Sequence, residues 1–371
     1  MIDYSERLKA LTSEPSRDVV GDPSRLARVG RTRDEMMAQG TAIAKTLAAE
    51  ADEIARIAVR LRERGIRHVV VAGCGDSWHV GTAAACAWES LAGIPLRAVQ
   101  ALDYANYGAL AADQHTLVIG ISSGGTTPAV LEALRAARRS GAFTLGVSNT
   151  PGSVALSEND AALVVHASRK GWPTQSSIAT TAMLIRLAQF FSDTDNAKSS
   201  STELDAIPAL VDNLASALDR QMSLIARDMA ASGLVLFAGL GPNYGAACFG
   251  AAKVKELSPI HAVALPLEEY HHYRSQKAGD TLVLVATDAA SHERALDTML
   301  VSEKLGGWTV VMVAEDLPEI TSRAQHTVRV PPVSRELLAL ISSIPLHLLA
   351  YHFAIERDAI GLGYVGGLPA H

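Results

Sequence analysis

The sequence predicts an α/β protein of two similar lobes, each a parallel sheet flanked by helices in a flavodoxin-like three-layer sandwich, behind an N-terminal helical leader. Three observations carry this prediction. Short apolar runs that suit buried strands alternate with alanine-rich helical stretches. Three of these runs recur in order later in the chain. Finally, 371 residues are too many for one ordinary hydrophobic core and suit two domains of roughly 150 residues.

The leader is expected from the first periodic stretch of the chain. Residues 24–65 carry apolar side chains at spacings of three, four or seven, and the stretch ends at Gly65, a usual helix stop. We therefore expect a helical leader over residues 1–50. The apolar positions of the stretch are Met36, Ile43, Leu47, Ile54, Ile57 and Leu61.

The repeat is defined by apolar runs that end in similar turns. Residues 68–72 (HVVVA) run into Gly73-Cys74-Gly75, and residues 234–238 (LVLFA) run into Gly239-Leu240-Gly241. Two further runs follow each of these at matching positions, with helical stretches between them, which predicts parallel sheets with right-handed crossovers. The pairs are 68–72 with 234–238, 117–120 with 282–285, and 144–147 with 309–312.

Domain boundaries follow from the polar stretch SDTDNAKSSSTE at residues 192–203, which is the best linker between the halves. We expect a first domain over residues 51–195, a linker or helix over 196–217, and a second domain over 218–371. The apolar segment 337–352 contains serines, a proline and a histidine, so it suits a buried helix better than a membrane span.

Composition limits the partners and the compartment. Hydrophobic residues make up 48% of the chain and aromatic residues only 5%, which favours helix-covered parallel sheets. A net charge of −6 argues against binding to nucleic acid or to an anionic membrane. Cys74, Cys86 and Cys248 show no CxxC spacing and cannot form a disulfide framework, so we expect a cytoplasmic protein.

An anion site is expected at the Ser122–Thr127 loop (SSGGTT), which follows one apolar run and precedes a helix beginning near Pro128. Ligands bind beyond the carboxyl ends of parallel strands, and this loop offers backbone N–H groups, hydroxyls and a helix N-terminus. The alternative is an ordinary capped loop, because serine and threonine are also preferred N-caps. The matching stretch in the second half, residues 286–291 (ATDAAS), contains an acid and no glycine.

The first glycine turn, residues 73–77 (GCGDS), lacks a dinucleotide fingerprint because Trp78 stands where the third glycine would be. No acidic residue ends the next strand in a suitable place. Ser77 either caps the following helix or touches a sugar hydroxyl. Both interpretations stay open at this point.

Five segments together resemble one known family, the double-SIS (sugar isomerase) proteins, which include the isomerase portion of glucosamine-6-phosphate synthase. The resemblance covers roughly residues 40–355 and implies two SIS-type lobes. Its segments are GCGDS (73–77), ESLAGIP (89–95), ISSGGTT (121–127), SNTPGS (148–153) and KVKELSPIHA (253–262).

The resemblance implies where a sugar phosphate would bind. In the family, the loop at residues 122–127 holds the phosphate, and a stretch matching residues 174–177 closes over the sugar. The family more usually has serine at the position of Gly124 and glutamate at that of Thr126, so the detailed hydrogen bonding is expected to differ. The expected substrate-binding residues are Gly75, Ser77, Ser122, Ser123, Gly125, Thr127 and Ser176.

Two catalytic residues are implied by the same resemblance. Glu256 matches the family glutamate that moves a proton between C1 and C2, a task that needs a carboxylate with a pKa near neutrality. The alternative is that Glu256 pairs with Lys253 or Lys255 on a solvated helix. His272, with His271 as its near neighbour, matches the histidine assigned to ring opening. The His-His pair also resembles a metal site, but no third ligand has helpful spacing, and we expect no metal.

The implied function is a phosphosugar enzyme that uses enediol-type proton transfer and needs no cofactor. The chain begins Met1-Ile2-Asp3 without the nucleophilic cysteine of a glutaminase domain, which makes glutamine-driven amination unlikely. We expect an amino-sugar-phosphate deaminase or a fructosamine-6-phosphate deglycase, acting as a homodimer. The alternatives are an aldose–ketose isomerase and a non-catalytic regulator, although regulators of this kind carry a DNA-binding helix-turn-helix.

Overall fold

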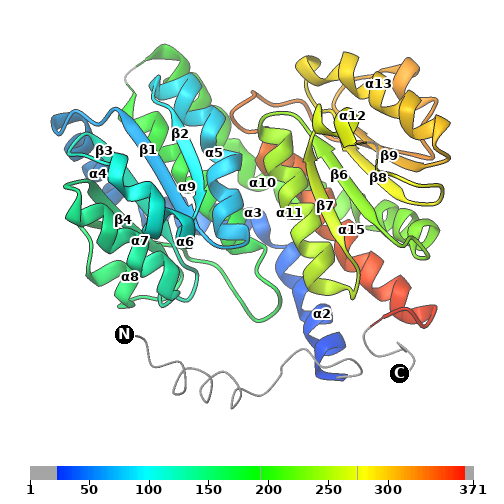
Figure 1. The fold of residues 1–371 in the computed structure, drawn as a ribbon, viewed down its shortest axis with the longest axis horizontal. Coiled ribbons are helices and arrows are strands. Elements are labelled where there is room, and N and C mark those ends of the chain that lie inside the picture. The colour runs from blue at the N-terminus through cyan, green and yellow to red at the C-terminus, as the bar shows by residue number, and fades with distance from the viewer. Residues whose placement is uncertain (1–22, 193, 274, 364–371) are drawn as a thin grey trace.

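The computed structural model describes residues 23–192, 194–273 and 275–363, which form two lobes side by side (Figure 1). The first 22 residues of the expected leader and the tail from residue 364 lie outside this range. Each lobe contains one five-stranded sheet in which the paired strands are parallel. Helices flank both sheets, so the predicted α/β fold of two similar lobes is confirmed.

The two sheets share one topology. The first has the order β2-β1-β3-β4-β5, and the second, β10-β9-β8-β6-β7, has the same order when read from its other edge. The strands of the first sheet are β1 (His68–Gly73), β2 (Leu96–Gln100), β3 (Thr116–Ile121), β4 (Phe143–Ser148) and β5 (Ala161–Val164). Those of the second are β6 (Val235–Gly239), β7 (Ala262–Pro266), β8 (Thr281–Val285), β9 (Trp308–Val313) and β10 (His326–Arg329).

The predicted runs are the inner strands of the sheets, and the strands that the sequence did not reveal lie at the edges. β1, β3, β4, β6, β8 and β9 are buried over most of their length. β2, β5, β7 and β10 mix buried with partly or fully exposed residues. An edge strand is covered less completely than an inner one, so its sequence shows no continuous apolar run.

Residues 24–65 are helical, as expected, in three separate helices. Four further long helices belong to the first lobe and the connection, and three to the second lobe. The main helices are α2 (Pro23–Met36), α3 (Gln39–Ala49), α4 (Ala51–Glu63), α5 (Asp76–Ala92), α7 (Pro128–Arg139), α9 (Gln175–Phe191), α10 (Asp195–Met229), α11 (Pro242–Leu257), α13 (Ala289–Lys304) and α15 (Leu338–Ala359). Short ones are α6 (Ala101–Asp103), η1 (Tyr104–Gly108), η2 (Ala109–Ala111), α8 (Val154–Ser157), α12 (Glu269–Tyr273) and α14 (Pro318–Thr321).

The connection between the lobes is a long helix rather than a loop. Residues 195–203, which belong to the polar stretch expected as a linker, form the first turns of α10, where the Thr194 hydroxyl accepts the Ala197 N–H at 3.2 Å. Farther along, Leu204, Ile207 and Val211 are buried at helical spacing. This apolar stripe packs α10 against α3, α9 and α15, which keeps the helix continuous through a polar start.

The expected buried helix at residues 337–352 is α15. It is the one described helix that is long and apolar enough to cross a membrane, and 83% of its most apolar window is buried inside the protein. A helix that is apolar on all sides suits the centre of a large core. α15 fills that place by packing against α10 and α11.

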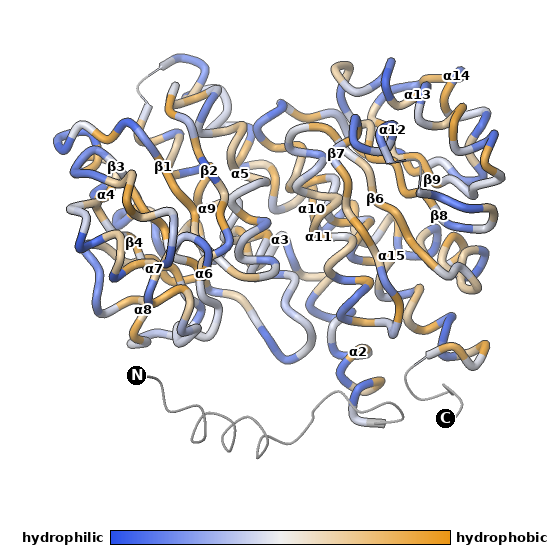
Figure 2. Tube along the Cα trace, viewed as in Figure 1, coloured by the Kyte–Doolittle hydropathy of each residue, from blue (hydrophilic) through white to orange (hydrophobic). Residues whose placement is uncertain are grey.

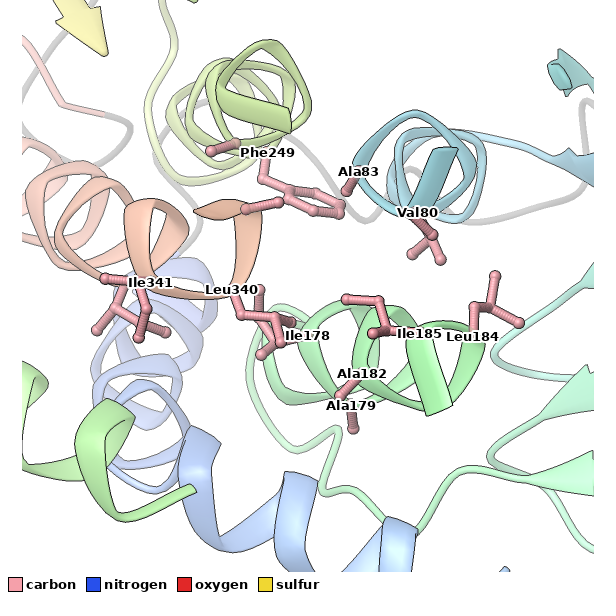
Figure 3. Packing of buried hydrophobic residues seen from close by; sticks show 14 of the residues in the cluster. Val80, Ala83, Ile178, Ala179, Ala182, Leu184, Ile185, Phe249, Leu340 and Ile341 are labelled. Carbon is pink, nitrogen blue, oxygen red and sulfur yellow. The ribbon is translucent and has the colours of Figure 1, made fainter. Parts of the chain in front are cut away.

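One apolar cluster runs through both lobes without a break. Figure 2 shows hydrophobic residues along the central strands of both sheets. Figure 3 shows the junction, where Ala83 of α5 lies near Phe249 of α11, and Ile178 of α9 lies near Leu340 of α15. The lobes therefore share a core, and their relative position is fixed by packing.

Helix α5 of the first lobe and α11 of the second cross in close contact. A Cβ atom on Gly245 would lie only 2.7 Å from the Cα of Ala83, so no larger residue fits there. α5 begins at Asp76 and α11 ends just beyond Glu256. This contact therefore sets how the start of one helix meets the end of the other.

Gly245→Val is expected to lower the free energy of unfolding by about 1–3 kcal/mol, because overpacking forces the two helices apart. The measurement is urea unfolding followed by circular dichroism. Gly30→Ala in α2 is the control, since a Cβ there meets nothing within 4 Å. It should leave stability unchanged or raise it by about 0.5–1 kcal/mol. Equal stability of Gly245→Val and wild type would contradict a tight crossing.

Candidate active site

A cleft of about 210 Å³ opens at the carboxyl ends of the strands of the first sheet. Its walls come from the turns after β1, β3 and β4, from the first turns of α5 and α9, and from the end of α11. Ligands of open parallel sheets bind at this edge. The lining residues are Cys74, Gly75, Asp76, Ser77, Val80, Ile121, Ser123, Val147, Ser148, Asn149, Val165, Pro173, Ser176, Ser177, Thr180 and Glu256.

The Ser122–Thr127 loop follows β3 and is held together by one hydroxyl. Ser122 Oγ accepts the N–H groups of Gly125 at 3.0 Å and Thr127 at 3.3 Å, and it shares a hydrogen bond with Thr127 Oγ1 at 2.8 Å. Ser122 is buried, with 2% of its surface exposed. Ser122 and Thr127 therefore shape the loop from within, and neither is among the residues that line the cleft.

Gly125 is required by the fold of this loop. Its φ of 73° lies in the left-handed region, and an added Cβ would lie 2.1 Å from Ser153 Oγ. Gly125 therefore lets the loop turn back toward α7 and does not itself line the cleft.

Ser123 is the hydroxyl of this loop that faces the cleft. It donates to Asn149 Oδ1 at 2.9 Å and accepts from Arg169 Nη1 at 3.0 Å. Asn149 in turn is anchored to the Val165 carbonyl at 3.1 Å. The sequence motif named Ser123 but neither of its partners, because both come from other loops.

The turn after β1 and the start of α9 supply the other expected contacts. Gly75 adopts a φ of 55°, and α5 begins at the next residue, so Ser77 lies in its first turn. Gly75, Ser77 and Ser176 all line the cleft. The Ser176 hydroxyl is buried and has no hydrogen-bond partner among the described residues. It is thus available to a ligand.

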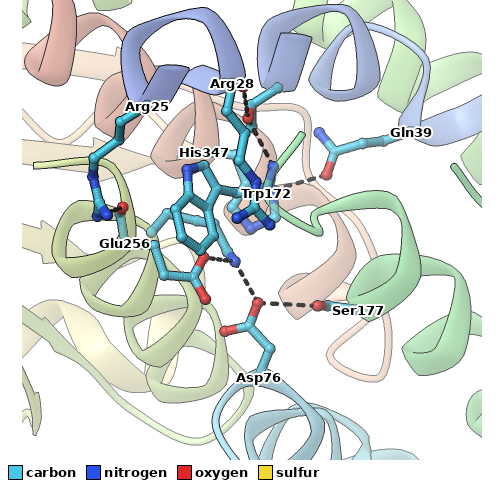
Figure 4. Close-up of polar contacts among 10 residues, drawn as sticks. Arg25, Arg28, Gln39, Asp76, Trp172, Ser177, Glu256 and His347 are labelled. Atoms are coloured by element: carbon cyan, nitrogen blue, oxygen red, sulfur yellow. Dashed lines mark hydrogen bonds and ion pairs between the residues drawn. The ribbon is translucent and has the colours of Figure 1, made fainter. Parts of the chain in front are cut away.

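A buried lysine lies at the junction of the lobes. Lys253 is completely buried, and its Nζ lies 2.7 Å from Asp76 Oδ2 and also contacts Glu256 Oε2. Figure 4 shows Asp76 and Glu256 facing the same ammonium group, with Ser177 donating to Asp76 at 3.2 Å. We call Asp76, Lys253 and Glu256 the Lys253 array. It joins α5 of the first lobe to α11 of the second.

Electrostatics suit Glu256 to accept and return a proton. Burial raises the pKa of Glu256 above its ordinary value of 4.5, the Lys253 ammonium opposes this, and Asp76 adds to it. For Lys253, burial alone would lower the pKa, but Asp76 and Glu256 raise it. The array therefore holds a protonated lysine next to a carboxylate whose pKa is moved toward neutrality.

The alternative expectation placed the Glu256–Lys253 pair on a solvated helix, and it is wrong about the solvation of that helix. The two side chains do pair, but α11 is buried along most of its length and only Lys255 is exposed on its last turns. The expectation made no distinction between Lys253 and Lys255. Lys253 lies three residues before Glu256 on an alanine-rich helix, and this spacing could have indicated that Lys253 is the partner.

His347 of α15 lies behind the array and stays neutral. Burial, with help from the Lys253 ammonium, lowers its pKa to about 3. Its Nδ1 bonds Gln39 Oε1 of α3 at 2.8 Å. Helices α3 and α15, the second and the last of the described chain, are thus joined behind the array (Figure 4).

The leader helix α2 holds the segment 168–175, which borders the cleft. Glu35 accepts the N–H groups of Lys170 at 2.6 Å and Gly171 at 3.2 Å. The Arg28 guanidinium lies 3.7 Å from the centre of the Trp172 ring. Arg25 donates to the Glu256 carbonyl at 2.7 Å (Figure 4). The leader is therefore part of the site's framework, which the sequence did not indicate.

The corresponding place in the second lobe is filled by its own side chains. Asn243 Oδ1 accepts from Thr287 at 2.8 Å and from Ser342 at 3.0 Å, while its Nδ2 donates to Asp288 at 3.2 Å. These hydrogen bonds are made within the second lobe. Residues 286–291 contain no glycine, and Thr287 and Asp288 of this stretch both contact Asn243.

His272 lies apart from the cleft of its own chain. It sits on α12 with 62% of its side chain exposed and with its Nε2 3.5 Å from Glu268. Its neighbour His271 bonds Thr298 Oγ1 at 2.9 Å. The described residues contain no group of three or more metal-ligating side chains, so the His-His pair has no third ligand there.

Comparison with known proteins identifies the family. A family model described as SIS domain matches residues 64–192 and 228–357, which are the two lobes. The chain belongs to the SIS domain family. The expected double-SIS architecture is thereby confirmed.

Relatives of this SIS protein include longer chains. The isomerizing glutamine–fructose-6-phosphate aminotransferase of Thermus thermophilus is 31% identical over 319 residues, covering 82% of this chain and 52% of the relative. That of Salmonella paratyphi A is 29% identical over 304 residues, covering 79% and 49%. The chain thus spans about half the length of the relatives it matches.

Solved structures share the fold. The C-terminal domain of the Francisella tularensis glucosamine-fructose-6-phosphate aminotransferase superposes with a TM-score of 0.73 at 24% identity, covering 87% of this chain and 95% of that one. A glucosamine-6-phosphate deaminase from Thermotoga maritima gives 0.68 at 19%, covering 89% and 95%. The Escherichia coli tagatose-6-phosphate ketose/aldose isomerase gives 0.70 at 17%, covering 91% and 95%.

The raised pKa of Glu256 predicts a pH-dependent stability. The folded state holds this proton more tightly than the unfolded chain, so its contribution is present below pH 4.5 and is lost as the pH rises through the folded pKa. Wild type should therefore lose stability relative to Glu256→Gln as the pH rises from 4.5 through the raised pKa of Glu256 in the folded protein. Urea unfolding across this range measures the difference.

Glu315→Gln is the control for this measurement, because it removes one negative charge from an exposed position far along the chain. A stability difference between wild type and Glu256→Gln that stays constant over the whole pH range would show that burial does not perturb Glu256.

Proposed function

We propose that the cleft binds a phosphorylated, amine-bearing sugar, that Glu256 moves a proton between C1 and C2, and that the amine is then released. The reaction is amino-sugar-phosphate deamination or fructosamine-6-phosphate deglycation. The observation that carries the proposal is the Lys253 array at the cleft, in which Glu256 pairs with a fully buried ammonium. Membership of the SIS family supports a phosphosugar substrate.

The phosphate is assigned to the turn after β3. Ser123 supplies a hydroxyl, and the first turns of α5 and α9 direct backbone N–H groups toward the same cleft. Ser122, Gly125 and Thr127 contribute by fixing the loop, as their hydrogen bonds and the glycine conformation require. Gly75, Ser77 and Ser176 are assigned to the sugar.

The amine is assigned to the acidic end of the cleft. Two carboxylates and one ammonium leave the Lys253 array with a net negative charge, which favours a cationic group of the substrate. Asp76 Oδ1 is buried without a hydrogen-bond partner among the described residues, although Asp76 lines the cleft. A buried acceptor of this kind is costly unless a ligand donates to it.

The chemistry balances with one base and one water molecule. Glu256 takes the proton from the carbon that bears the amine, and the electron pair of that C–H bond forms a C1=C2 double bond. The π electrons of the neighbouring carbonyl group move to its oxygen, which takes up a proton. Glu256 then returns its proton to the former carbonyl carbon, while the nitrogen lone pair forms a C=N bond at the carbon that bears the amine and the nitrogen releases one proton. Water adds to this carbon, the C–N bond breaks, and a carbonyl group and the free amine result. The protonated Lys253 holds the Glu256 carboxylate at the cleft.

Two solved structures that share the fold are named for sugar-phosphate enzymes. The Thermotoga maritima structure is named a glucosamine-6-phosphate deaminase, and the Escherichia coli structure is named a tagatose-6-phosphate ketose/aldose isomerase. Both names state a sugar phosphate as the substrate, which is consistent with the proposed substrate class.

His272 enters the proposal through a second copy of the chain. Its exposed position on α12 keeps it away from the cleft of its own chain, so ring opening by His272 requires a partner that presents this helix. We propose that the protein is a cytoplasmic homodimer in which His272 has this role. The resemblance to double-SIS proteins, whose sites are shared between subunits, supports it.

The proposal is tested with a panel of hexose, hexosamine and fructosamine 6-phosphates, with ammonia, free amine and ketose as readouts. We expect amine release, and we expect Glu256→Gln to abolish it while phosphate-ligand binding is retained, because the base is lost and the loop is not. Ketose formation without amine would indicate an isomerase. Binding without turnover would indicate a regulator, and near wild-type turnover of Glu256→Gln would remove this residue from its role.

Lys253→Met is expected to move the acidic limb of the kcat–pH profile to higher pH. Lys253 is the main group that lowers the pKa of Glu256, so its removal leaves burial and Asp76 to raise that pKa further. Lys255→Met is the matched control, since Lys255 is exposed on the same helix. Identical profiles of wild type and Lys253→Met would contradict the coupling.

A further inference from the structure

One arginine outside the expected motifs reaches the loop assigned to phosphate. Arg169 lies in the segment 168–175 between β5 and α9, and its Nη1 donates to Ser123 Oγ at 3.0 Å. Ser123 is the residue of the 122–127 loop that lines the cleft. The guanidinium therefore stands at the hydroxyl where a bound phosphate would be held.

The arginine also occupies the neighbourhood of Gly124. A Cβ atom on Gly124 would lie 3.8 Å from Arg169 Nη1, which is ordinary van der Waals contact. At this position the resembling family more usually has a serine. Where the family has a serine hydroxyl, this chain therefore has the Arg169 guanidinium close by. A guanidinium offers several N–H donors and a full positive charge.

Within residues 23–192, 194–273 and 275–363, no carboxylate pairs with Arg169. Its guanidinium contacts the neutral Ser123 hydroxyl. Its side chain is exposed, so it is hydrated and ready to exchange water for an anion. The loop itself carries no charged side chain, and the hydroxyls of Ser122 and Thr127 are engaged within it.

The backbone around Arg169 is fixed by groups from two other helices. The N–H of Ser168 donates to Gln175 Oε1 at 2.9 Å, and the N–H of Lys170 donates to Glu35 Oε1 at 2.6 Å. Glu35 belongs to the leader helix α2. Less entropy is lost on ligand binding when the backbone of the binding residue is already ordered.

We propose that Arg169 binds the substrate phosphate and determines specificity for phosphorylated over unphosphorylated sugars. The inference deepens the proposed function of the same cleft and rests on it. With Arg169 at one end and the Lys253 array at the other, the cleft is positive near Ser123 and negative near Asp76. An amine-bearing sugar phosphate carries the opposite charges at its two ends, so it is accepted in one orientation.

The test is isothermal titration with glucitol 6-phosphate and with glucitol, which lack a carbonyl group and cannot be turned over. Arg169→Gln should weaken glucitol 6-phosphate binding about tenfold or more and leave glucitol binding unchanged, because a charge-assisted hydrogen bond is lost. Arg169→Lys should retain part of the affinity. The salt dependence of phosphate binding should become shallower in Arg169→Gln.

Lys170→Gln is the matched control, since it removes the same charge from the adjacent exposed position. Equal affinity of wild type and Arg169→Gln for glucitol 6-phosphate would overturn the role of Arg169 and leave the proposed function standing. An equal loss in Lys170→Gln would also overturn it, because net charge would then be the cause. A wild type that binds neither glucitol 6-phosphate nor any sugar phosphate of the activity panel would overturn the proposed function itself.

Discussion

The site depends on one buried positive charge. The Lys253 ammonium is fully buried, and it is tolerated because Asp76 from one lobe and Glu256 from its own helix face it. Removing one partner of a buried ion pair typically costs about 3–5 kcal/mol, since the remaining charge is left without compensation. The crossing of α5 and α11 at Gly245 is what brings the two helix ends to this distance.

Two lobes of the same topology therefore contribute differently. The first lobe supplies the loops and helix N-termini around the cleft, and the second supplies Glu256 and Lys253. The second lobe's own loop is closed by the Asn243 network, so its equivalent edge is occupied by protein groups. The two lobes share one backbone topology, but their side chains differ at the cleft, so the site itself is not symmetric.

Much of the fold and part of the site could be predicted from the sequence, and the failures have physical causes. Buried inner strands can be recognised in the sequence as apolar runs, whereas edge strands such as β2 and β7 cannot. Ser123 and Glu256 lie at the cleft as their motifs suggested. Ser122 was expected to contact phosphate, but its hydroxyl is used inside the loop, which only the backbone geometry shows.

Contacts between distant segments escaped prediction altogether. Arg169, Asn149 and the leader residue Glu35 meet the cleft through loops whose positions depend on the whole fold. The burial of Lys253 depends on α15, which packs against α11 but begins only at Leu338. The role of His272 stays a prediction, because it concerns a second copy of the chain.

The contacts of α2 with the segment 168–175, and of His347 with Gln39, affect how the chain can fold during translation. The framework of the cleft draws on residues near both ends of the described chain, from Arg25 and Glu35 to His347. A nascent chain can form the first sheet early, since domains generally fold from the N-terminus during translation. It cannot complete the ligand-binding cleft until α15 has emerged from the ribosome.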